Sequence, residues 1–485
     1  MAPPINADGY GRPERSYRDL LWQFGAHLKD YCSNCTLAGF AYIANSRLHP
    51  TERVFWLICV LVSSLGCYCL IVEYQRSFPT RAVSIVYESL PPFSNWKFPS
   101  VSVCEYLHKY QLIPKYVDYI GSLGVDRDGG YPYELEVGFA AILYPPTYNE
   151  GTLKQLCPTV SQCPNCATCP SGNFRQIKNW YGANCSDVMA ECKLSGQPFD
   201  CCQYFQPLIT PFGPCFMLNS LQNNEPGSEH WLNTDLDPSY QKAKLELGMK
   251  TSVHVSVLNE EDIAHTAIVP PGVPISLPGQ GKYFQIQVVR MVNDPDVNEV
   301  DPKIRSCLFP NESPPASQYK AYSFTTCIAD CARKMQIETC GCASIFVSPT
   351  EDPRYPDCDL DGFLCLESHG LIKPDSKLLK NNNKGHKDSC GCLPSCNDGD
   401  IQIIYEAFST YNQSTTLRTV TISIPALPTD QFRRQAIRTR LDVVVSMGGM
   451  LGLFLGASIL SAIEFIYYFT VRPFTNMLRA RSARV

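Results

Sequence analysis

The sequence lacks the motifs that the common enzyme classes require. It contains no HExxH metal-binding motif, no phosphate-binding loop and no arrangement of nucleophile, base and acid. Charge is also scarce, because Asp, Glu, Lys and Arg make up only 18% of the 485 residues. These absences argue against an enzyme and direct attention to the segments in which charge is missing altogether.

Two long windows carry no charged residue. Residues 54–72 and 443–463 are apolar, and at about 1.5 Å per helical residue each is long enough to cross a bilayer core of about 30 Å. The first window does not have the pattern of a signal peptide, since no small-residue cleavage site follows it. We therefore predict a membrane protein with transmembrane helices over 54–72 and 443–471. A mean hydropathy of −0.13 indicates that most of the chain lies outside the bilayer.

Cysteine indicates which side of the membrane each part occupies. Of 25 cysteines, 20 lie between Cys104 and Cys396 in dense clusters, as in the disulfide framework of a secreted domain. We therefore expect residues 73–442 to be extracellular, with residues 1–53 and the tail at 472–485 in the cytosol at a plasma membrane. The N-glycosylation sequons that this orientation would expose are Asn184, Asn311 and Asn412.

A zinc site is a second interpretation of some of these cysteines. The spacing C-x2-C-x2-C at Cys163, Cys166 and Cys169 is typical of zinc ligands. An oxidising compartment with further cysteines nearby favours disulfides instead. Cys32 and Cys35 form another C-x2-C on the cytosolic side, where two free thiols are the simpler expectation. We therefore expect neither a metal site nor a cofactor.

The extracellular segment has the pattern of an α+β domain. Five stretches alternate apolar and polar residues as half-buried strands do, namely 96–106, 250–258, 282–292, 401–408 and 418–424. Residues 151–215 are rich in Cys and Pro and predict an irregular, disulfide-stapled subdomain. Residues 319–337 have helical spacing, with Cys327 and Cys331 on one face. A sheet is thus the predicted scaffold.

Several of these features occur together in one known family. The chain carries FPSVSVC (98–104) after the first window, a block of ten cysteines, and GLFLGAS (452–458) in the second window. With two spans around a large Cys-rich domain, it resembles the degenerin/epithelial sodium channel family over about residues 35–470. The resemblance implies a homotrimeric or heterotrimeric sodium channel whose extracellular domain has palm, finger, knuckle and thumb parts. Its partners are then two further subunits, the lipid bilayer and the permeant sodium ion, and no nucleic acid.

The second window contains residues that helix packing alone does not explain. Gly448, Gly452 and Gly456 could form a small-residue stripe for tight packing. Ser458 and Glu464 do not fit that stripe, and charged residues in a span usually face water or the bundle interior. In a trimer, backbone carbonyls and hydroxyls near the axis would offer oxygen ligands to a partly dehydrated sodium ion. The resemblance implies a selectivity filter of Gly456, Ala457 and Ser458, and the expected pore-lining residues are Ser446, Gly449 and Glu464.

The resemblance also implies disulfide pairs, which the sequence alone leaves open. In the family's nested order the pairs are Cys307 with Cys396, Cys327 with Cys392, Cys331 with Cys390, Cys340 with Cys365, and Cys342 with Cys358. Cys104 and Cys215 match the pair that joins a palm strand to the end of the finger. The eight remaining cysteines of the domain can form four more bridges whose partners stay open: Cys157, Cys163, Cys166, Cys169, Cys185, Cys192, Cys201 and Cys202.

The family's gating residues carry over only in part. The Thr-Leu-His-Gly stretch before the first span is TLAG here, with Ala38 in place of His and Gly39 retained as a gating residue. Val445 stands where bulky substitutions lock degenerins open. Ser446 and Ala82 replace a pore aspartate and a proton-sensing histidine of acid-sensing channels. Proton gating is therefore not expected.

The expected stimulus is an extracellular peptide. The enlarged Cys-rich finger could hold a rigid apolar pocket, and the stretches 138–146 and 201–216 supply aromatic residues, although these could equally fill the finger's own core. The whole pattern most resembles the FMRFamide-gated sodium channels of invertebrates, which implies amiloride block and a peptide agonist whose binding residues stay unassigned. The alternatives are a constitutively open or mechanically gated channel of the same family, and a membrane-anchored Cys-rich adhesion receptor.

Overall fold

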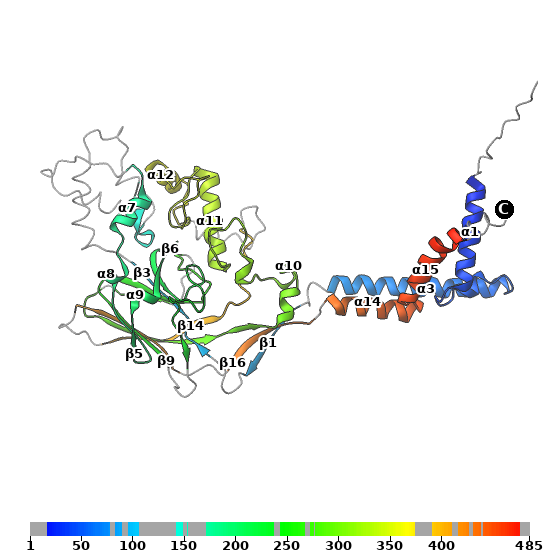
Figure 1. Cartoon of the computed structure of the whole chain (residues 1–485), viewed down its shortest axis with the longest axis horizontal. Coiled ribbons are helices and arrows are strands. Elements are labelled where there is room, and N and C mark those ends of the chain that lie inside the picture. The colour runs from blue at the N-terminus through cyan, green and yellow to red at the C-terminus, as the bar shows by residue number, and fades with distance from the viewer. Residues whose placement is uncertain are drawn as a thin grey trace, which may run out of the picture. The chain divides into compact units, whose positions relative to one another are not determined.

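The computed structural model describes residues 17–77, 83–89, 96–105, 142–148, 153, 171–236, 243–266, 272–275, 277–373, 390–409, 416–425, 430–437 and 440–475. These residues form two compact units. The helical unit takes the described residues of Met1–Ser84, Asp296–Val300 and Ala436–Val485, and the sheet unit those of Ile85–Pro295 and Asp301–Gln435. Figure 1 labels many of the helices and strands of the two units.

The helical unit contains both apolar windows. Its longest helix, α3 (Pro50–Ser77), covers the whole of 54–72 and begins at a proline, whose missing N–H has no helical partner to lose in the first turn. The second window is divided between α14 (Arg440–Leu455) and α15 (Ile459–Ile466). The remaining helical elements are α1 (Tyr17–Asn34), α2 (Phe40–Ala44) and a π-helical turn at Tyr467–Val471.

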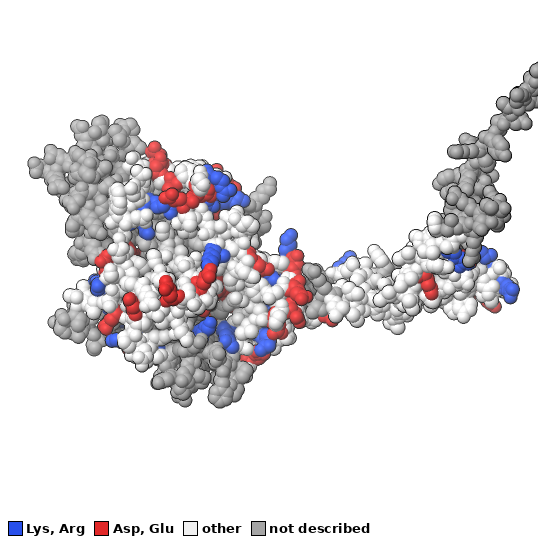
Figure 2. Space-filling model, in the orientation of Figure 1, with Lys and Arg blue, Asp and Glu red and all other residues white. Residues whose placement is uncertain are grey.

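The surface of these helices suits hydrocarbon. Among the described residues, α3 is long and apolar enough to cross a membrane, and the bent pair Leu441–Leu455 and Ile459–Thr475 makes a second span if it is counted as one. The side chains of Leu61 and Val62 on α3 are 59% and 65% exposed, which would be unfavourable in water. Figure 2 shows that the middle of the α3 and α14 pair carries no Lys, Arg, Asp or Glu on the face in view.

The sheet unit is built on two large β-sheets. One has the strand order β14-β12-β15-β9-β4-β5 and the other β11-β10-β3-β7-β6, while smaller sheets have the orders β1-β16-β13 and β2-β8. The strands are β1 (Val83–Ser89), β2 (Trp96–Lys97), β3 (Ser100–Glu105), β4 (Met189–Leu194), β5 (Gln197–Phe199), β6 (Phe205–Thr210), β7 (Gly213–Leu218), β8 (Asp235–Leu236), β9 (Ala243–Met249), β10 (Val253–Leu258), β11 (Gly272–Ile275), β12 (Gly281–Val289), β13 (Met291–Asn293), β14 (Asp400–Ser409), β15 (Arg418–Ile424) and β16 (Asp430–Ala436).

The two large sheets share one hydrophobic core. Leu245 and Leu247 of β9 enter it from the six-stranded sheet, and Val101 and Val103 of β3 from the five-stranded sheet. All four side chains are at most 2% exposed. Because strand side chains alternate between faces, one apolar residue in two is enough to build this core. The same alternation explains why the strand predicted at 418–424 coincides with β15.

Disulfides hold together the ladder segment, which we define as residues 307–396. It contains α11 (Phe324–Cys340) and α12 (Leu360–Ser368). Its bonds are Cys307–Cys396, Cys327–Cys392, Cys331–Cys390, Cys340–Cys365 and Cys342–Cys358. These are the five nested pairs that the resemblance implies. Because each bond closes a loop of the unfolded chain, the set favours the folded segment by limiting the unfolded chain's conformational entropy.

Among the residues that the structure describes, three further disulfides lie outside the ladder segment. Cys104–Cys215, also implied by the resemblance, joins directly opposed residues of β3 and β7. Cys185–Cys202 and Cys192–Cys201 pair four of the eight cysteines that the sequence left open. The other four, which include the suggested zinc pattern, are outside the described residues: Cys157, Cys163, Cys166 and Cys169.

The predicted start of one helix and the predicted irregularity of one segment are both wrong. The helix expected at 319–337 begins only at Phe324, because Ser323 caps it and its Oγ accepts a hydrogen bond from the Thr326 N–H at 3.1 Å. The sequence predicts an irregular segment at 151–215, but its described part forms β4, β5, β6, the first half of β7 and the helices α7 (Phe174–Tyr181), α8 (Cys185–Val188) and α9 (Cys201–Tyr204). Closely spaced Cys and Pro obscure the alternation of those strands, and disulfides stabilise strands that have few apolar residues.

A cluster of carboxyl groups, of which Glu261 is buried, connects the loop after β10 to the ladder segment. Ser395 donates to Glu261 Oε1 at 2.7 Å, and Asn259 Nδ2 donates to carboxylate oxygens of Asp262 (3.1 Å) and Asp398 (3.0 Å). Burial and the charge of Asp262 raise the pKa of Glu261 to about 7. Burial and the same charge raise the pKa of Asp398 to about 6. The junction is therefore more stable when a proton is bound.

Replacing Glu261 should remove part of the protein's pH-dependent stability. The pKa of Glu261 is raised in the folded state, so its contribution is most favourable below its ordinary value of 4.5 and is lost as the pH rises through about 7. We expect Glu261→Gln to reduce the difference in melting temperature between pH 5 and pH 8. The measurement is thermal unfolding of the detergent-purified chain. The control is Glu338→Gln, because that carboxylate is 63% exposed; a pH dependence unchanged by Glu261→Gln contradicts the assignment.

Candidate functional site

The second apolar window is interrupted at Gly456, Ala457 and Ser458. α14 ends at Leu455 and α15 begins at Ile459, and the two helices are bent by 74°. These three residues are the ones predicted to form a filter. The break occurs in a segment apolar enough for a bilayer, where unpaired backbone groups are costly unless they line a cavity or are covered by protein.

Local sequence explains where each helix stops and starts. Gly456 has φ +63°, a left-handed conformation that favours glycine, and its N–H donates to the Gly452 carbonyl at 3.0 Å, as in a left-handed helix C-cap. Ser458 then caps α15, because its Oγ accepts from the Ser461 N–H and its own N–H donates to Ser461 Oγ, both at 3.2 Å. A glycine stop followed two residues later by a serine start makes the break a property of the sequence.

The segment before α2 covers part of this break from within the helical unit. The N–H of Ala38 donates to the Leu455 carbonyl, the last of α14, at 3.0 Å. Gly456 lies so close to this segment that an added Cβ would be 3.4 Å from the Cβ of Ala38. Gly39 has φ +87°, and an added Cβ would be 2.7 Å from Val60 on α3. Only glycine therefore fits at position 39, which gives the predicted gating residue a steric role.

Thr36 holds the same segment to α15. Its N–H and Oγ1 both donate to Glu464 Oε2, at 3.0 and 2.9 Å, and Oγ1 is also 2.7 Å from Ser461 Oγ. Ser461 thus connects Thr36 to Ser458. Sequence analysis missed Thr36 and Ser461, although a polar residue in an apolar span is a signal for such a contact. The pore-lining role of Glu464 stays a prediction, and one of its carboxylate oxygens is bound to Thr36.

Aromatic rings and one ion pair secure α1 beside α15. The Tyr31 ring is 5.7 Å from that of Phe465 and 5.6 Å from those of Tyr468 and Phe469. Arg472 pairs with Asp30 at 2.9 Å and lies over the Tyr468 ring. The N-terminal segment that reaches the break is therefore anchored on both sides of Thr36.

The other predicted residues of the second window lie on α14. Val445 is 64% exposed, and Ser446 is half-buried. An added Cβ on Gly448 or Gly449 would have no described atom of this chain within 4 Å. Within the described part of a single chain, these two glycines therefore make no close helix contact. The space beside them is therefore open to a neighbouring subunit or to a pore. The pore-lining roles of Ser446 and Gly449 stay predictions.

The predicted apolar pocket of the finger is partly filled by its own side chains. In the described part of 138–146, Ile142, Leu143 and Tyr144 are at most 2% exposed and pack with ladder residues such as Phe363. In 201–216, Phe205 belongs to the core of the two sheets. The structure thus favours a core role for the aromatic residues that it describes, and it assigns none of them to a peptide.

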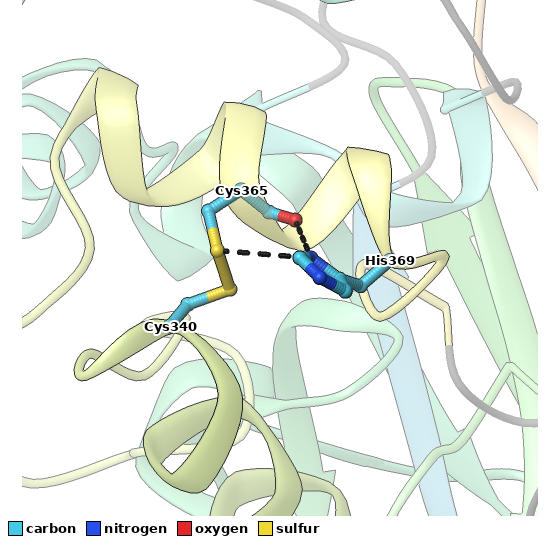
Figure 3. A group of neighbouring side chains, drawn as sticks. All are labelled: Cys340, Cys365 and His369. Atoms are coloured by element: carbon cyan, nitrogen blue, oxygen red, sulfur yellow. Dashed lines mark hydrogen bonds between the residues drawn. A yellow bond between two sulfur atoms is a disulfide. The ribbon is translucent and has the colours of Figure 1, made fainter.

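One cluster of cysteine and histidine has metal-like spacing. Figure 3 shows Cys340, Cys365 and His369, whose ligand atoms lie within 4.8 Å of one another. The two sulfur atoms are bonded to each other, so neither is available as a thiolate. His369 Nδ1 lies 2.9 Å from the Cys365 carbonyl. The arrangement is a helix-end contact beside a disulfide.

Of the sequons, Asn184 and Asn311 are exposed, and Asn412 is outside the described residues.

Comparison with known proteins gives a consistent result. The model of the family described as amiloride-sensitive sodium channel matches residues 31–468. Pickpocket protein 19 of Drosophila melanogaster is 22% identical over 86% of this chain and 86% of its own length. Sodium channel protein Nach of Drosophila ananassae is 22% identical over 91% of this chain and 86% of its own. Acid-sensing ion channel 4 of Mus musculus is 20% identical over 91% of this chain and 78% of its own length.

Removing the hydroxyl of Thr36 should loosen the N-terminal segment from α15. Thr36→Val loses the Oγ1 contacts to Glu464 and Ser461 but keeps the backbone N–H bond. A hydrogen bond to a charged group contributes about 1.5–3 kcal/mol, so amide exchange of residues 32–39 should rise about tenfold or more. Hydrogen exchange read by mass spectrometry tests this on the full chain. Thr36→Ser is the control, and equal protection in Thr36→Val and wild type contradicts the anchor.

Proposed function

The chain belongs to the amiloride-sensitive sodium channel family, and on this premise we propose that it is a subunit of a trimeric, sodium-selective channel that an extracellular peptide opens and amiloride blocks. The observation that carries the conducting part is the break at Gly456, Ala457 and Ser458 in an otherwise apolar span. Membership of a channel family argues against the adhesion-receptor alternative. Sodium is the permeant ion in this proposal, and no cofactor is required.

The geometry of the break supports a sodium filter at this position. The carbonyls at the end of α14 carry the negative end of the helix dipole, and the last four have no partner within that helix. Three chains around an axis would present three sets of such oxygens, together with the Ser458 hydroxyls, to an ion that has lost part of its water shell. Gly456 and Ala457 are small enough to keep that ring narrow.

The Thr36 and Ala38 contacts hold this ring in place. They connect the break to the segment before the first span, so the backbone around the filter is fixed by a second part of the same chain. A fixed ring of oxygens can discriminate between ions of different radius better than a ring free to adjust. The N-terminal segment is therefore part of the proposed conducting site.

Peptide opening rests on the resemblance and on departures from acid-sensing channels. Ser446 and Ala82 stand where those channels have an aspartate and a histidine, which removes support for protons as the stimulus. The constitutive and mechanically gated alternatives stay open within the family. These alternatives differ in the condition under which current begins, which is either rest, a mechanical stimulus or an added peptide.

Oocyte recording separates these alternatives. The chain is expressed alone, and current is recorded at rest and then with amidated Phe-containing peptides, with acid and with amiloride. We expect a sodium current only with a peptide and its reduction by amiloride. Current at rest favours the constitutive alternative, and strong opening at about pH 5 contradicts the interpretation of Ala82 and Ser446. Surface biotinylation distinguishes a closed channel from a missing one.

Ser458 provides the sharpest test of the filter. In Ser458→Leu, three larger side chains would remove hydroxyl ligands from the narrow ring and change its width. The reversal potential should therefore move toward the potassium equilibrium potential, or the current should vanish. The change also removes the α15 cap, which costs about 1 kcal/mol. The matched control is Ser64→Leu on α3, with surface biotinylation for both. Normal current with an unchanged reversal potential in Ser458→Leu contradicts the filter.

A further inference from the structure

Strand β16 is the part of the sheet unit that precedes α14 along the chain. It ends at Ala436, and α14 begins at Arg440. β16 lies between β1 and β13 in the three-stranded sheet, and it runs parallel to β13. Only three residues of the chain therefore separate the end of this strand from the start of the second span.

Arg434 of β16 reaches the base of the ladder segment. Its Nη1 donates to the Cys396 carbonyl at 2.8 Å and lies 3.0 Å from the sulfur of Cys307. Those two cysteines form the bond that closes the ladder, across 89 residues of sequence. The same nitrogen donates to Asn293 Oδ1 at 3.3 Å, and Asn293 Nδ2 donates to the Cys396 carbonyl at 2.9 Å. One guanidinium thus joins β16, β13 and the ladder.

This cation is buried, which is costly without compensation. Arg434 is 8% exposed, and burial together with the charge of Arg305 lowers its pKa, while the charge of Asp398 opposes that shift. A desolvated guanidinium persists only where fixed acceptors replace its water. Two of its three acceptors belong to the closing disulfide and the Cys396 carbonyl, so displacement of the ladder base from β16 would leave the guanidinium with only Asn293 Oδ1 of these acceptors. The contact therefore resists separation of the two elements.

The neighbouring arginine has different partners. Arg433 is 40% exposed, and it pairs with Glu88 of β1 at 2.8 Å and with Asp294 at 3.2 Å. It secures β16 within its own sheet and does not contact the ladder segment among the described residues. Of these two adjacent arginines, Arg433 therefore stabilises β16 within its sheet, whereas Arg434 attaches β16 to the ladder segment.

We propose that Arg434 is a positioning residue that couples the ladder segment to the second span, so that movement of the ladder reaches α14 through β16. This inference rests on the proposed channel function for its gating consequence. The attachment itself does not depend on that function, because it follows from the contacts of Arg434 with Cys396 and Cys307. The two parts can therefore be tested separately.

The gating test compares Arg434→Gln with Arg433→Gln in oocytes. We expect Arg434→Gln to shift the half-maximal peptide concentration at least tenfold. If current flows at rest, the fraction of channels open at rest should change by the same factor. The reversal potential and the amount of surface protein per cell should stay within twofold of wild type. Arg434→Lys, which keeps the charge but not the planar fork, should restore part of the shift. Normal gating in Arg434→Gln channels at the surface overturns the coupling.

Hydrogen exchange of the purified full chain tests the attachment without any current. Arg434→Gln should raise exchange both in residues 431–436 and in residues 393–397, whereas Arg433→Gln should raise it only in 431–436. Unchanged protection of 393–397 in Arg434→Gln overturns the attachment. If the wild type gives no current under any stimulus, the proposed function fails while the exchange result still decides whether Arg434 joins the two elements.

Discussion

An interrupted helix in hydrocarbon must have its freed backbone groups satisfied, and most of the helical unit follows from this constraint. The stop at Gly456 and the start at Ser458 leave helix ends in the middle of an apolar span. Ala38 satisfies one freed carbonyl, and Thr36 binds the only carboxylate of α15, Glu464. The docked N-terminal segment is thus a requirement of the break, and a break with such support can keep the oxygens of an ion site in place.

The sheet unit depends on covalent bonds where the helical unit depends on hydrogen bonds. Its two large sheets have a common apolar core, whereas the ladder segment is held by five disulfides. A segment braced in this way moves as one body more readily than it deforms. Glu261, a buried carboxyl group in the loop after β10, marks the junction at which that loop meets the ladder segment.

Features set by local pattern could be predicted from the sequence. The alternation at 418–424 predicted β15 residue for residue, and the first apolar window lies within α3. The disulfide pairs came from the resemblance, since spacing allows many connectivities. The contact of Thr36 with Glu464 joins residues 428 apart. No periodicity reports such a contact, because it depends on how α1 and α15 fold back on each other. The late start of α11 was missed because its Ser323 cap lies within a helix-like pattern.

Two of the chain connections between the sheet unit and the helical unit lead from β1 back to α3 and from β16 on to α14. The two strands are neighbours in one sheet, and Glu88 of β1 accepts from both Gln431 and Arg433 of β16. The connections are therefore held to each other before either span begins. A load applied to β16 alone would be shared with β1, so both spans of a subunit would respond to it together. In the proposed channel such a shared connection would favour opening, because moving one span alone would strain the α3 and α14 pair instead of displacing it.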